Sequence, residues 1–197
     1  MDIPIEKEVL DTVLTLIHTR QHVSPKRLGD PGPDAAQTEE ILRAASAAPD
    51  HGRLNPWRLI IIPRERRHLL GDAFAGALAE RDSTSTAAQR EEARGKAQRA
   101  PLLILVVVRL DPVLGETHPR ERMVSAGCAI QNMLLAAHAM GYGAGLASGR
   151  ALYSQQLRTL FKLTQHEQPL CFFSAGTVTT GKASRPRPRI EDYTSSL

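Results

Sequence analysis

The chain has 197 residues, of which 42% are hydrophobic and only 4% aromatic, and it carries a formal net charge of +4. This length fits one domain, and the charge suits an anionic ligand but falls well short of an arginine-rich nucleic-acid arm. Because no stretch approaches the ~20 apolar residues that cross a bilayer, and the acidic start MDIPIEKEVL is unlike a signal peptide, we expect a soluble, cytoplasmic protein with no membrane or nucleic-acid partner.

The first part of the chain reads as two helices separated by a loop. Apolar residues at helical spacing predict a helix over residues 9–17, which places Arg20 at its C-terminal end. The following SPKRLGDPGP is rich in proline and glycine and predicts a loop. Asp34, with Gln37 three residues later, resembles a capping box, so we expect a second helix over residues 35–48.

The middle of the chain alternates loops, strands and helices. PDHGRLNP is a turn-rich loop that carries His51 and Asn55 into WRLIII, a β-branched run that predicts a strand. Residues 65–81 have a helical pattern, whereas the charge-rich residues 82–100 predict an exposed, mobile helical excursion. The run LLILVVV, residues 102–108, is apolar without alternation, which predicts a strand covered by helices on both faces.

The last part of the chain begins with a long helix, expected over residues 122–140, whose many small side chains suit close packing against another helix. GYGAG ends this helix, and LAS predicts a short strand or turn. A short helix over residues 154–161 and a final strand, LCFFSAGTV, follow. The tail after Thr179 is extended and basic without core-forming periodicity, so it must lie across another surface to be ordered.

The motifs of several enzyme classes are missing from the sequence. Cys128 and Cys171 lie in apolar runs without a CxxC pattern or a Cys/His cluster, which favours buried thiols in a reducing compartment. No HExxH or paired-cysteine spacing predicts a metal site, and no GxSxG predicts a serine hydrolase. GYGAGLASG lacks the GxGxxG pattern and follows a helix, which argues against a Rossmann loop.

Four segments, taken in order, resemble the nitroreductase family and particularly its minimal members. They are the helix ending at Arg20 with Ser24 after it, ILRAASAAPDHGRLNPWRLIII, SAGCAIQNMLLAAHAMGYGAG, and SAGTV followed by a basic tail. The resemblance implies an α+β fold, a three-layer α/β/α sandwich with a mixed, mainly antiparallel sheet. It also implies that residues 1–197 form a single domain in an interlocked homodimer, with residues 180–197 as a C-terminal arm that reaches the partner subunit.

The resemblance further implies an FMN-dependent oxidoreductase. Hydride would pass from NADH or NADPH through the flavin N5 atom to a small aromatic acceptor, such as a nitroaromatic or a quinone, in a ping-pong cycle. Because the flavin performs this chemistry and the protein orients it, no catalytic side chain and no metal are expected.

By the same resemblance, the segment Arg20, Gln21, His22 and Ser24 would bind the FMN phosphate and the edge of the flavin ring. The family usually has Arg-Arg-Ser where this chain has Arg20, Gln21 and His22, so one fixed positive charge is missing. A protonated His22 or an arginine of the tail could replace it. Arg187 corresponds best to the late basic residue of the family. The competing basic residues of the tail are Lys182, Arg185 and Arg189.

Two further segments correspond to flavin-binding positions of the family. His51 and Asn55 fall where family members reach from one subunit to the flavin held mainly by the other. Leu146, Ala147 and Ser148 match the segment whose backbone runs along the flavin ring, and the glycines on either side of them permit a close backbone approach.

Two alternative functions remain open at the level of sequence. The altered Gln21–His22 pair favours a protein that binds FMN without turnover, for storage or sensing, or a basic-tailed binding module. Alternatively, the chain could be a family variant that dehalogenates aromatic compounds reductively or consumes the flavin itself.

Overall fold

The central element is one β-sheet, seen in a computed structural model that describes residues 6–111, 118–181, 183 and 186–197. Its strands are β1 (Leu28–Gly29), β2 (Trp57–Ile61), β3 (Leu102–Arg109), β4 (Gly143–Ala147) and β5 (Glu167–Val178). Adjacent strands pair antiparallel in the order β1-β5-β3-β2, and β4 also pairs with β5. A parallel contact comes from an isolated bridge between His22 and Ala144, so the sheet is mixed but mainly antiparallel.

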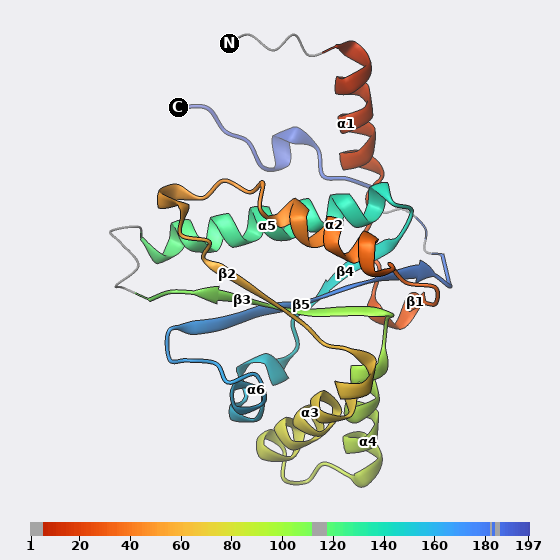
Figure 1. Cartoon of the computed structure of the whole chain (residues 1–197), viewed down its shortest axis with the longest axis vertical. Coiled ribbons are helices and arrows are strands. Elements are labelled where there is room, and N and C mark those ends of the chain that lie inside the picture. The colour runs from red at the N-terminus through yellow and green to blue at the C-terminus, as the bar shows by residue number, and fades with distance from the viewer. Residues whose placement is uncertain (1–5, 112–117, 182, 184–185) are drawn as a thin grey trace.

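The helices are α1 (Lys7–Thr19), α2 (Ala35–Ala45), α3 (Arg67–Arg81), α4 (Ala87–Gly95), α5 (Pro119–Ala139) and α6 (Gln155–Leu160), and all but α1 cover the faces of this sheet. Figure 1 shows α2 and α5 on one side of the sheet and α3, α4 and α6 on the other. This arrangement confirms the expected three-layer α+β fold. Within the described residues, no helix is both long enough and apolar enough to cross a membrane.

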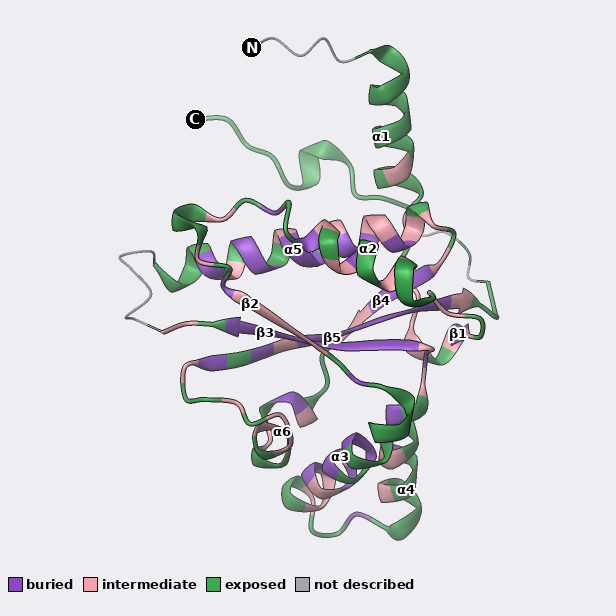
Figure 2. Cartoon of the chain, in the orientation of Figure 1, coloured by how far each residue is buried: buried purple, intermediate pink, exposed green. Residues whose placement is uncertain are grey.

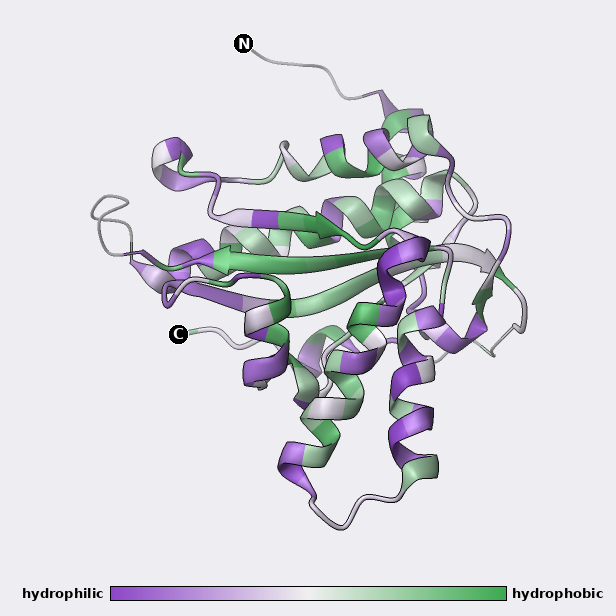
Figure 3. Ribbon diagram, turned by 60° about the horizontal axis from the view of Figure 1, so that its bottom comes forward, coloured by the Kyte–Doolittle hydropathy of each residue, from purple (hydrophilic) through white to green (hydrophobic). Residues whose placement is uncertain are grey.

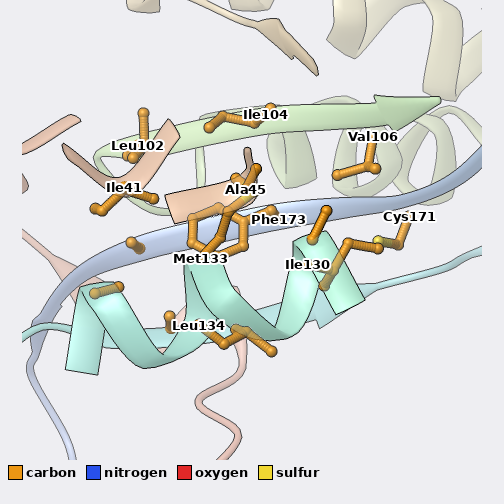
Figure 4. Packing of buried hydrophobic residues seen from close by; sticks show 14 of the residues in the cluster. Ile41, Ala45, Leu102, Ile104, Val106, Ile130, Met133, Leu134, Cys171 and Phe173 are labelled. Carbon is orange, nitrogen blue, oxygen red and sulfur yellow. The ribbon is translucent and has the colours of Figure 1, made fainter. Parts of the chain in front are cut away.

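Strand β3 places alternate residues into two cores, because successive side chains of a strand point to opposite faces. Ile104 and Val106 pack with Met133 of α5, as Figure 4 shows, whereas Leu105 and Val107 belong to the core under α3 and α6. All seven residues from Leu102 to Val108 are buried, as predicted. Burial of each large aliphatic side chain contributes about 1.5–3 kcal/mol. Figure 2 and Figure 3 show that β3 is both buried and apolar along most of its length.

Helix α4 confirms that residues 82–100 form a helical and mostly exposed excursion, but one side of this segment is docked. A capping box between Thr86 and Gln89 starts the helix, which then packs along α3. The approach is close, because a Cβ atom added at Gly71 would lie 3.0 Å from the carbonyl oxygen of Arg94. Ala93 is buried in this contact. The small apolar residues of the segment therefore suffice to dock it, and its mobility stays a prediction.

Helix α1 and the C-terminal tail stand apart from the layered body in Figure 1. The helix ends at Thr19 and places Arg20 at its C-cap, as the sequence predicted. None of its residues is buried, and its apolar residues are largely exposed in the single chain: Val9, Leu10, Val13, Leu14 and Ile17. The tail returns to α1 at Arg187, whereas Lys182 and Arg185 lie outside the described residues.

The second helix and the cysteines differ in detail from expectation. Helix α2 has the predicted capping box between Asp34 and Gln37 but ends at Ala45, about one turn earlier than predicted. Both cysteines are free thiols. Cys171 is buried as predicted, whereas Cys128 is only half-buried and packs at the edge of the core under α5.

Candidate functional site

The segment after α1 runs beside the edge strand β4. The backbone N–H of Val23 donates a 2.9 Å hydrogen bond to the carbonyl oxygen of Ala144, and His22 forms the parallel bridge to the same residue. The N–H of Leu146 donates to Nδ1 of His22 over 3.4 Å. These contacts fix the position of the His22 ring beside β4.

Gly145 allows this close approach. A Cβ atom at this position would lie 2.2 Å from the carbonyl oxygen of Val23 and 2.9 Å from Cε1 of His22. Real Cβ atoms essentially never come this close to other heavy atoms, and one of the two neighbours is backbone. The glycine is thus required to seat the segment from Arg20 to Ser24 against β4.

Two arginines meet at the end of α1. The Nη2 atom of Arg187 donates hydrogen bonds of 2.6 Å to the carbonyl oxygen of Arg20 and 3.2 Å to that of His18. Partial burial and then the charge of Arg187 lower the pKa of the Arg20 guanidinium from its ordinary value. Among the described residues, no carboxylate forms a salt bridge with either guanidinium, whereas Arg189 is paired with Asp192. Two adjacent cations without a counter-ion suit an anionic group.

Two hollows flank this segment. One of about 550 Å³, the α1/β4 hollow, is lined by the residues from Thr19 to Ser24, the end of α5 and the start of β4. The other, of about 440 Å³, is the α3/α4 hollow, which lies between α3, α4, the end of β4 and the middle of β5. Ser24 lines both. Each volume is in the range of small-molecule sites, about 300–1,000 Å³.

The floor of the α3/α4 hollow is apolar and aromatic. Phe74 of α3 and Phe172 of β5 make an edge-to-face contact with ring centroids 5.6 Å apart and an interplanar angle of 85°. Leu103 and Leu152 complete the floor. A flat ring would therefore find apolar surface here.

One polar group in this hollow has no partner. The Ser174 hydroxyl is fully buried and makes no hydrogen bond to another described residue. Ser174 faces the hollow together with Phe172, two positions earlier on β5. Its cross-strand neighbours are Leu103 and Gly145, which offer no polar side chain. Because an unpaired buried hydroxyl costs about 1–3 kcal/mol, this group is available to a ligand.

The structure brings together most of the residues predicted for the phosphate segment. The α1/β4 hollow is lined by Arg20, Gln21, His22 and Ser24. The guanidinium group of Arg187 contacts the backbone carbonyl oxygen of Arg20. These residues come from the two ends of the chain. The result agrees with the prediction of one shared site but does not by itself test their roles.

The segment from Leu146 to Ser148, whose backbone is predicted to run along the flavin ring, is divided between two environments. Ala147 lines the α3/α4 hollow, but Leu146 packs against the core under α5 and Ser148 is exposed outside both hollows. The alternation of side chains along β4 is the physical reason, since neighbours on a strand face opposite sides. Only the backbone of Leu146 and Ser148 could follow a ligand that lies on the Ala147 side.

His51 and Asn55 lie on the loop before β2 and line neither hollow. The Nδ1 atom of His51 lies 2.7 Å from Oε2 of Glu121, at the start of α5. Asn55 has a positive φ of 45°, and its N–H donates to Asp50 over 2.7 Å. Both side chains are exposed in the single chain, so a role in flavin binding would need a second subunit.

Most residues of the α3/α4 hollow were not predicted from the sequence. Its floor residue Phe74, its buried Ser174 and its basic rim were not predicted. The basic residues of the rim are Arg81, Lys96, Arg99 and Arg150. Three of them lie in or beside the charge-rich segment that was read as an excursion. Ala93 and Ala97 of that segment are buried, and their side of the segment faces the body of the protein. This orientation could not be read from the charge pattern.

Comparison with known proteins identifies the family of this chain and its fold. A family model described as "Nitroreductase family" matches residues 19–177. A protein of Haemophilus influenzae named "Putative NAD(P)H nitroreductase" is 35% identical over 164 residues, covering 83% of this chain and 87% of that protein. The crystal structure of a nitroreductase-like family protein from Bacillus cereus has a TM-score of 0.81 at 21% identity, covering 100% of this chain and 98% of the other.

A further structural neighbour carries a ligand. The crystal structure of oxidised iodotyrosine deiodinase, bound to FMN and 3-iodo-L-tyrosine, has a TM-score of 0.68 at 18% identity. The alignment covers 90% of this chain and 96% of that protein. At this level of identity, the likeness concerns the fold alone.

Proposed function

Because the chain belongs to the nitroreductase family of oxidoreductases, we propose that it is an FMN-dependent enzyme that passes electrons from NADH or NADPH to nitroaromatic, quinone or related acceptors. One observation carries this proposal more than any other. An uncompensated pair of arginines lies next to a ring-sized apolar hollow. FMN combines a phosphate dianion with a flat ring system, and these two features fit the two kinds of surface.

The phosphate end would be held by Arg20 and Arg187. Their guanidinium groups come from opposite ends of the chain, and neither has a carboxylate partner among the described residues. Gln21 and Ser24 add an amide and a hydroxyl on the same segment. Arg187 thus takes the place of the cation that Gln21 lacks. Charge-assisted hydrogen bonds of this kind are roughly twice as strong as neutral ones.

The ring end would lie past Ser24, toward the α3/α4 hollow. Ala147 and the backbone on either side of it border that hollow, and the Ser174 hydroxyl supplies a buried polar group. When bound, the flavin supplies two-electron chemistry through its ring. The residues of this chain orient the ring, exclude water from one side and place positive potential near it.

The electron balance of the proposed reaction needs no further co-reactant. Reduction of a nitro group to a nitroso group takes up two electrons and two protons and releases water. NAD(P)H supplies both electrons and one proton as hydride, and solvent supplies the second proton. Because donor and acceptor would use the same pocket in turn, we expect ping-pong kinetics.

The proposed assembly is a homodimer. An isolated helix with five apolar side chains exposed along one side is unfavourable in water, and a second copy of the chain would cover that surface. Residues 186–197 of the tail, which Figure 1 shows beside α1, would be covered in the same interface. In such a dimer, His51 and Asn55 would be free to contact the flavin of the other subunit.

The decisive experiment is the visible spectrum of the purified protein, reconstituted with FMN and then mixed with NADPH or NADH without oxygen. A bound flavin that is bleached by either donor and regains its colour on addition of menadione or a nitroarene supports the proposal. A bound flavin that stays yellow contradicts it and favours storage or sensing. Reoxidation by an iodinated phenol with release of iodide, and not by a nitroarene, would indicate a dehalogenase instead.

A further inference from the structure

The rim of the α3/α4 hollow is strongly basic. Arg81 ends α3, Arg99 precedes β3, and Arg150 begins a short 3₁₀ helix, Arg150–Tyr153, so three separate segments each contribute a guanidinium group. Lys96 adds a fourth cation. None of the described residues that line this hollow is acidic.

Among the described residues, the side chains of these three arginines make no hydrogen bond and no salt bridge, whereas Lys96 lies 3.7 Å from Glu92. The carboxylate next to Arg81, that of Asp82, accepts hydrogen bonds from Thr84, which together are the main cause of its lowered pKa, and the charge of Arg81 makes a smaller contribution. The charges of the rim are therefore available to a ligand.

The floor under this rim is built for an aromatic ring, and it contains a second, independent indication of a ligand. Phe74 and Phe172 offer ring faces and edges, and the buried hydroxyl of Ser174 lacks a partner. A ligand that satisfies all these groups is flat and apolar on one side, has a polar atom for Ser174, and ends in a negative charge.

The proposed FMN does not account for the whole rim. Its phosphate has Arg20 and Arg187 at the end of α1, on the other side of Ser24, and its oxidised ring is neutral. Positive potential near the ring would favour the reduced flavin, but three guanidinium groups and Lys96 exceed the single negative charge that the ring gains on reduction. An anionic partner that enters the hollow beside the ring makes use of them.

We propose that the basic rim selects the acceptor, so that the preferred substrates are anionic aromatic molecules such as aromatic carboxylates or sulfonates. This inference rests on the proposed function and names the substrate class of the same site. Arg81, Arg99 and Arg150 act as specificity-determining residues, because guanidinium groups match the planar geometry of a carboxylate.

The experiment compares matched acids and amides on the FMN-loaded protein. Binding of benzoate and of benzamide, neither of which is reduced, is measured by calorimetry and by the shift of the flavin spectrum. Reduction of 4-nitrobenzoate and of 4-nitrobenzamide is then measured as kcat/KM under one donor. We expect the acid to be preferred in both measurements by about tenfold, as expected for charge-assisted contacts, and the preference to fall as salt is added.

Variants assign the preference to the rim. Arg81→Gln and Arg150→Gln should each lower the acid-to-amide ratio severalfold, and the double variant should bring it close to one, with little change for the amide. Arg90→Gln is the matched control, because it removes the same charge from α4 outside the hollow. It should leave the ratio unchanged.

The outcomes separate this inference from the proposed function. Equal binding of benzoate and benzamide would overturn the inference even if the flavin is reduced and reoxidised normally. A bound flavin that neither NADH nor NADPH bleaches would contradict the proposed function. The titration with benzoate would still measure the affinity of the basic rim for an anion. If Arg81→Gln and Arg150→Gln weakened NADPH binding and left the acid-to-amide ratio intact, the rim would serve the phosphate of the donor, and the inference would be wrong.

Discussion

Arg187 donates a 2.6 Å hydrogen bond to the carbonyl oxygen of Arg20, so the tail of the chain is fastened to the end of its first helix. The contact brings two positive charges together without a counter-ion among the described residues. Such an arrangement is unfavourable unless an anion binds, because like charges repel and Arg20 is partly removed from water.

Arg20→Ala should therefore weaken FMN binding by about tenfold to a hundredfold, as expected for loss of one charge-assisted contact of 1.5–3 kcal/mol. Riboflavin, which lacks the phosphate, should bind the variant and the wild type equally. Fluorescence quenching titrations with both flavins make the comparison. An equal loss for FMN and riboflavin would show that Arg20 supports the fold of the site and not the phosphate.

Gly145→Ala should displace the segment from Arg20 to Ser24. The new methyl group would lie 2.2 Å from the carbonyl oxygen of Val23, and backbone must move to relieve the contact. We expect FMN affinity to fall at least tenfold, with little change in far-ultraviolet circular dichroism. Gly95→Ala is the control, because a Cβ atom there meets nothing within 4 Å and Gly95 has a helical φ of −60°. Normal FMN binding by Gly145→Ala would refute this role.

Ser174→Ala should stabilise the protein without cofactor by about 1 kcal/mol, because it removes a buried hydroxyl that has no partner. Thr177→Val on the same strand should have the opposite effect, since the Thr177 hydroxyl donates a 2.6 Å hydrogen bond to the carbonyl oxygen of Pro31. Urea unfolding of both variants measures the free energies. Clear destabilisation of the apoprotein by Ser174→Ala would mean that its hydroxyl is already satisfied.

The burial of Cys171 predicts that the free energy of unfolding falls at alkaline pH. Burial raises the pKa of its thiol from 9.0 to about 11. The folded state thus holds the proton more tightly than the unfolded state. The stabilising contribution is complete below pH 9 and is lost as the pH rises from 9 to 11, by about 3 kcal/mol at 1.36 kcal/mol per pKa unit.

The test compares unfolding free energies between pH 8 and pH 11 for the wild type and for Cys171→Ala. The variant lacks the thiol and should lose less stability over this range, although its absolute stability is lower. Parallel curves for the two proteins would contradict the assignment. Other groups that titrate in this range are present in both proteins, so their contributions cancel when the two unfolding free energies are compared.

Leu14→Glu on α1 should convert the proposed dimer into a monomer. The side chain is 42% exposed in the single chain, so the substitution disturbs no core of its own protomer. A charge in the middle of an apolar interface leaves a buried ion without a partner. Thr15→Glu, on the polar side of the same helix, is the control. Sedimentation velocity gives the answer, and a dimeric Leu14→Glu variant would place the interface elsewhere.

Local patterns in the sequence were sufficient for most elements of the fold. The uniformly apolar run from Leu102 to Val108 indicated a strand buried on both faces, and the Asp34–Gln37 pair located the start of α2. Arg20 was correctly placed at a helix end. These features depend on residues a few positions apart, whose spacing is fixed by the geometry of helices and strands.

Only the tertiary structure decided which distant residues share the site. The approach of Arg187 to Arg20 joins positions 167 residues apart, and the isolation of the Ser174 hydroxyl depends on its neighbours on two other strands. The basic rim of the α3/α4 hollow likewise gathers side chains from separate segments. No periodicity encodes such contacts, because they arise from the way that strands pair and helices pack, and from the face of the sheet that each side chain then occupies.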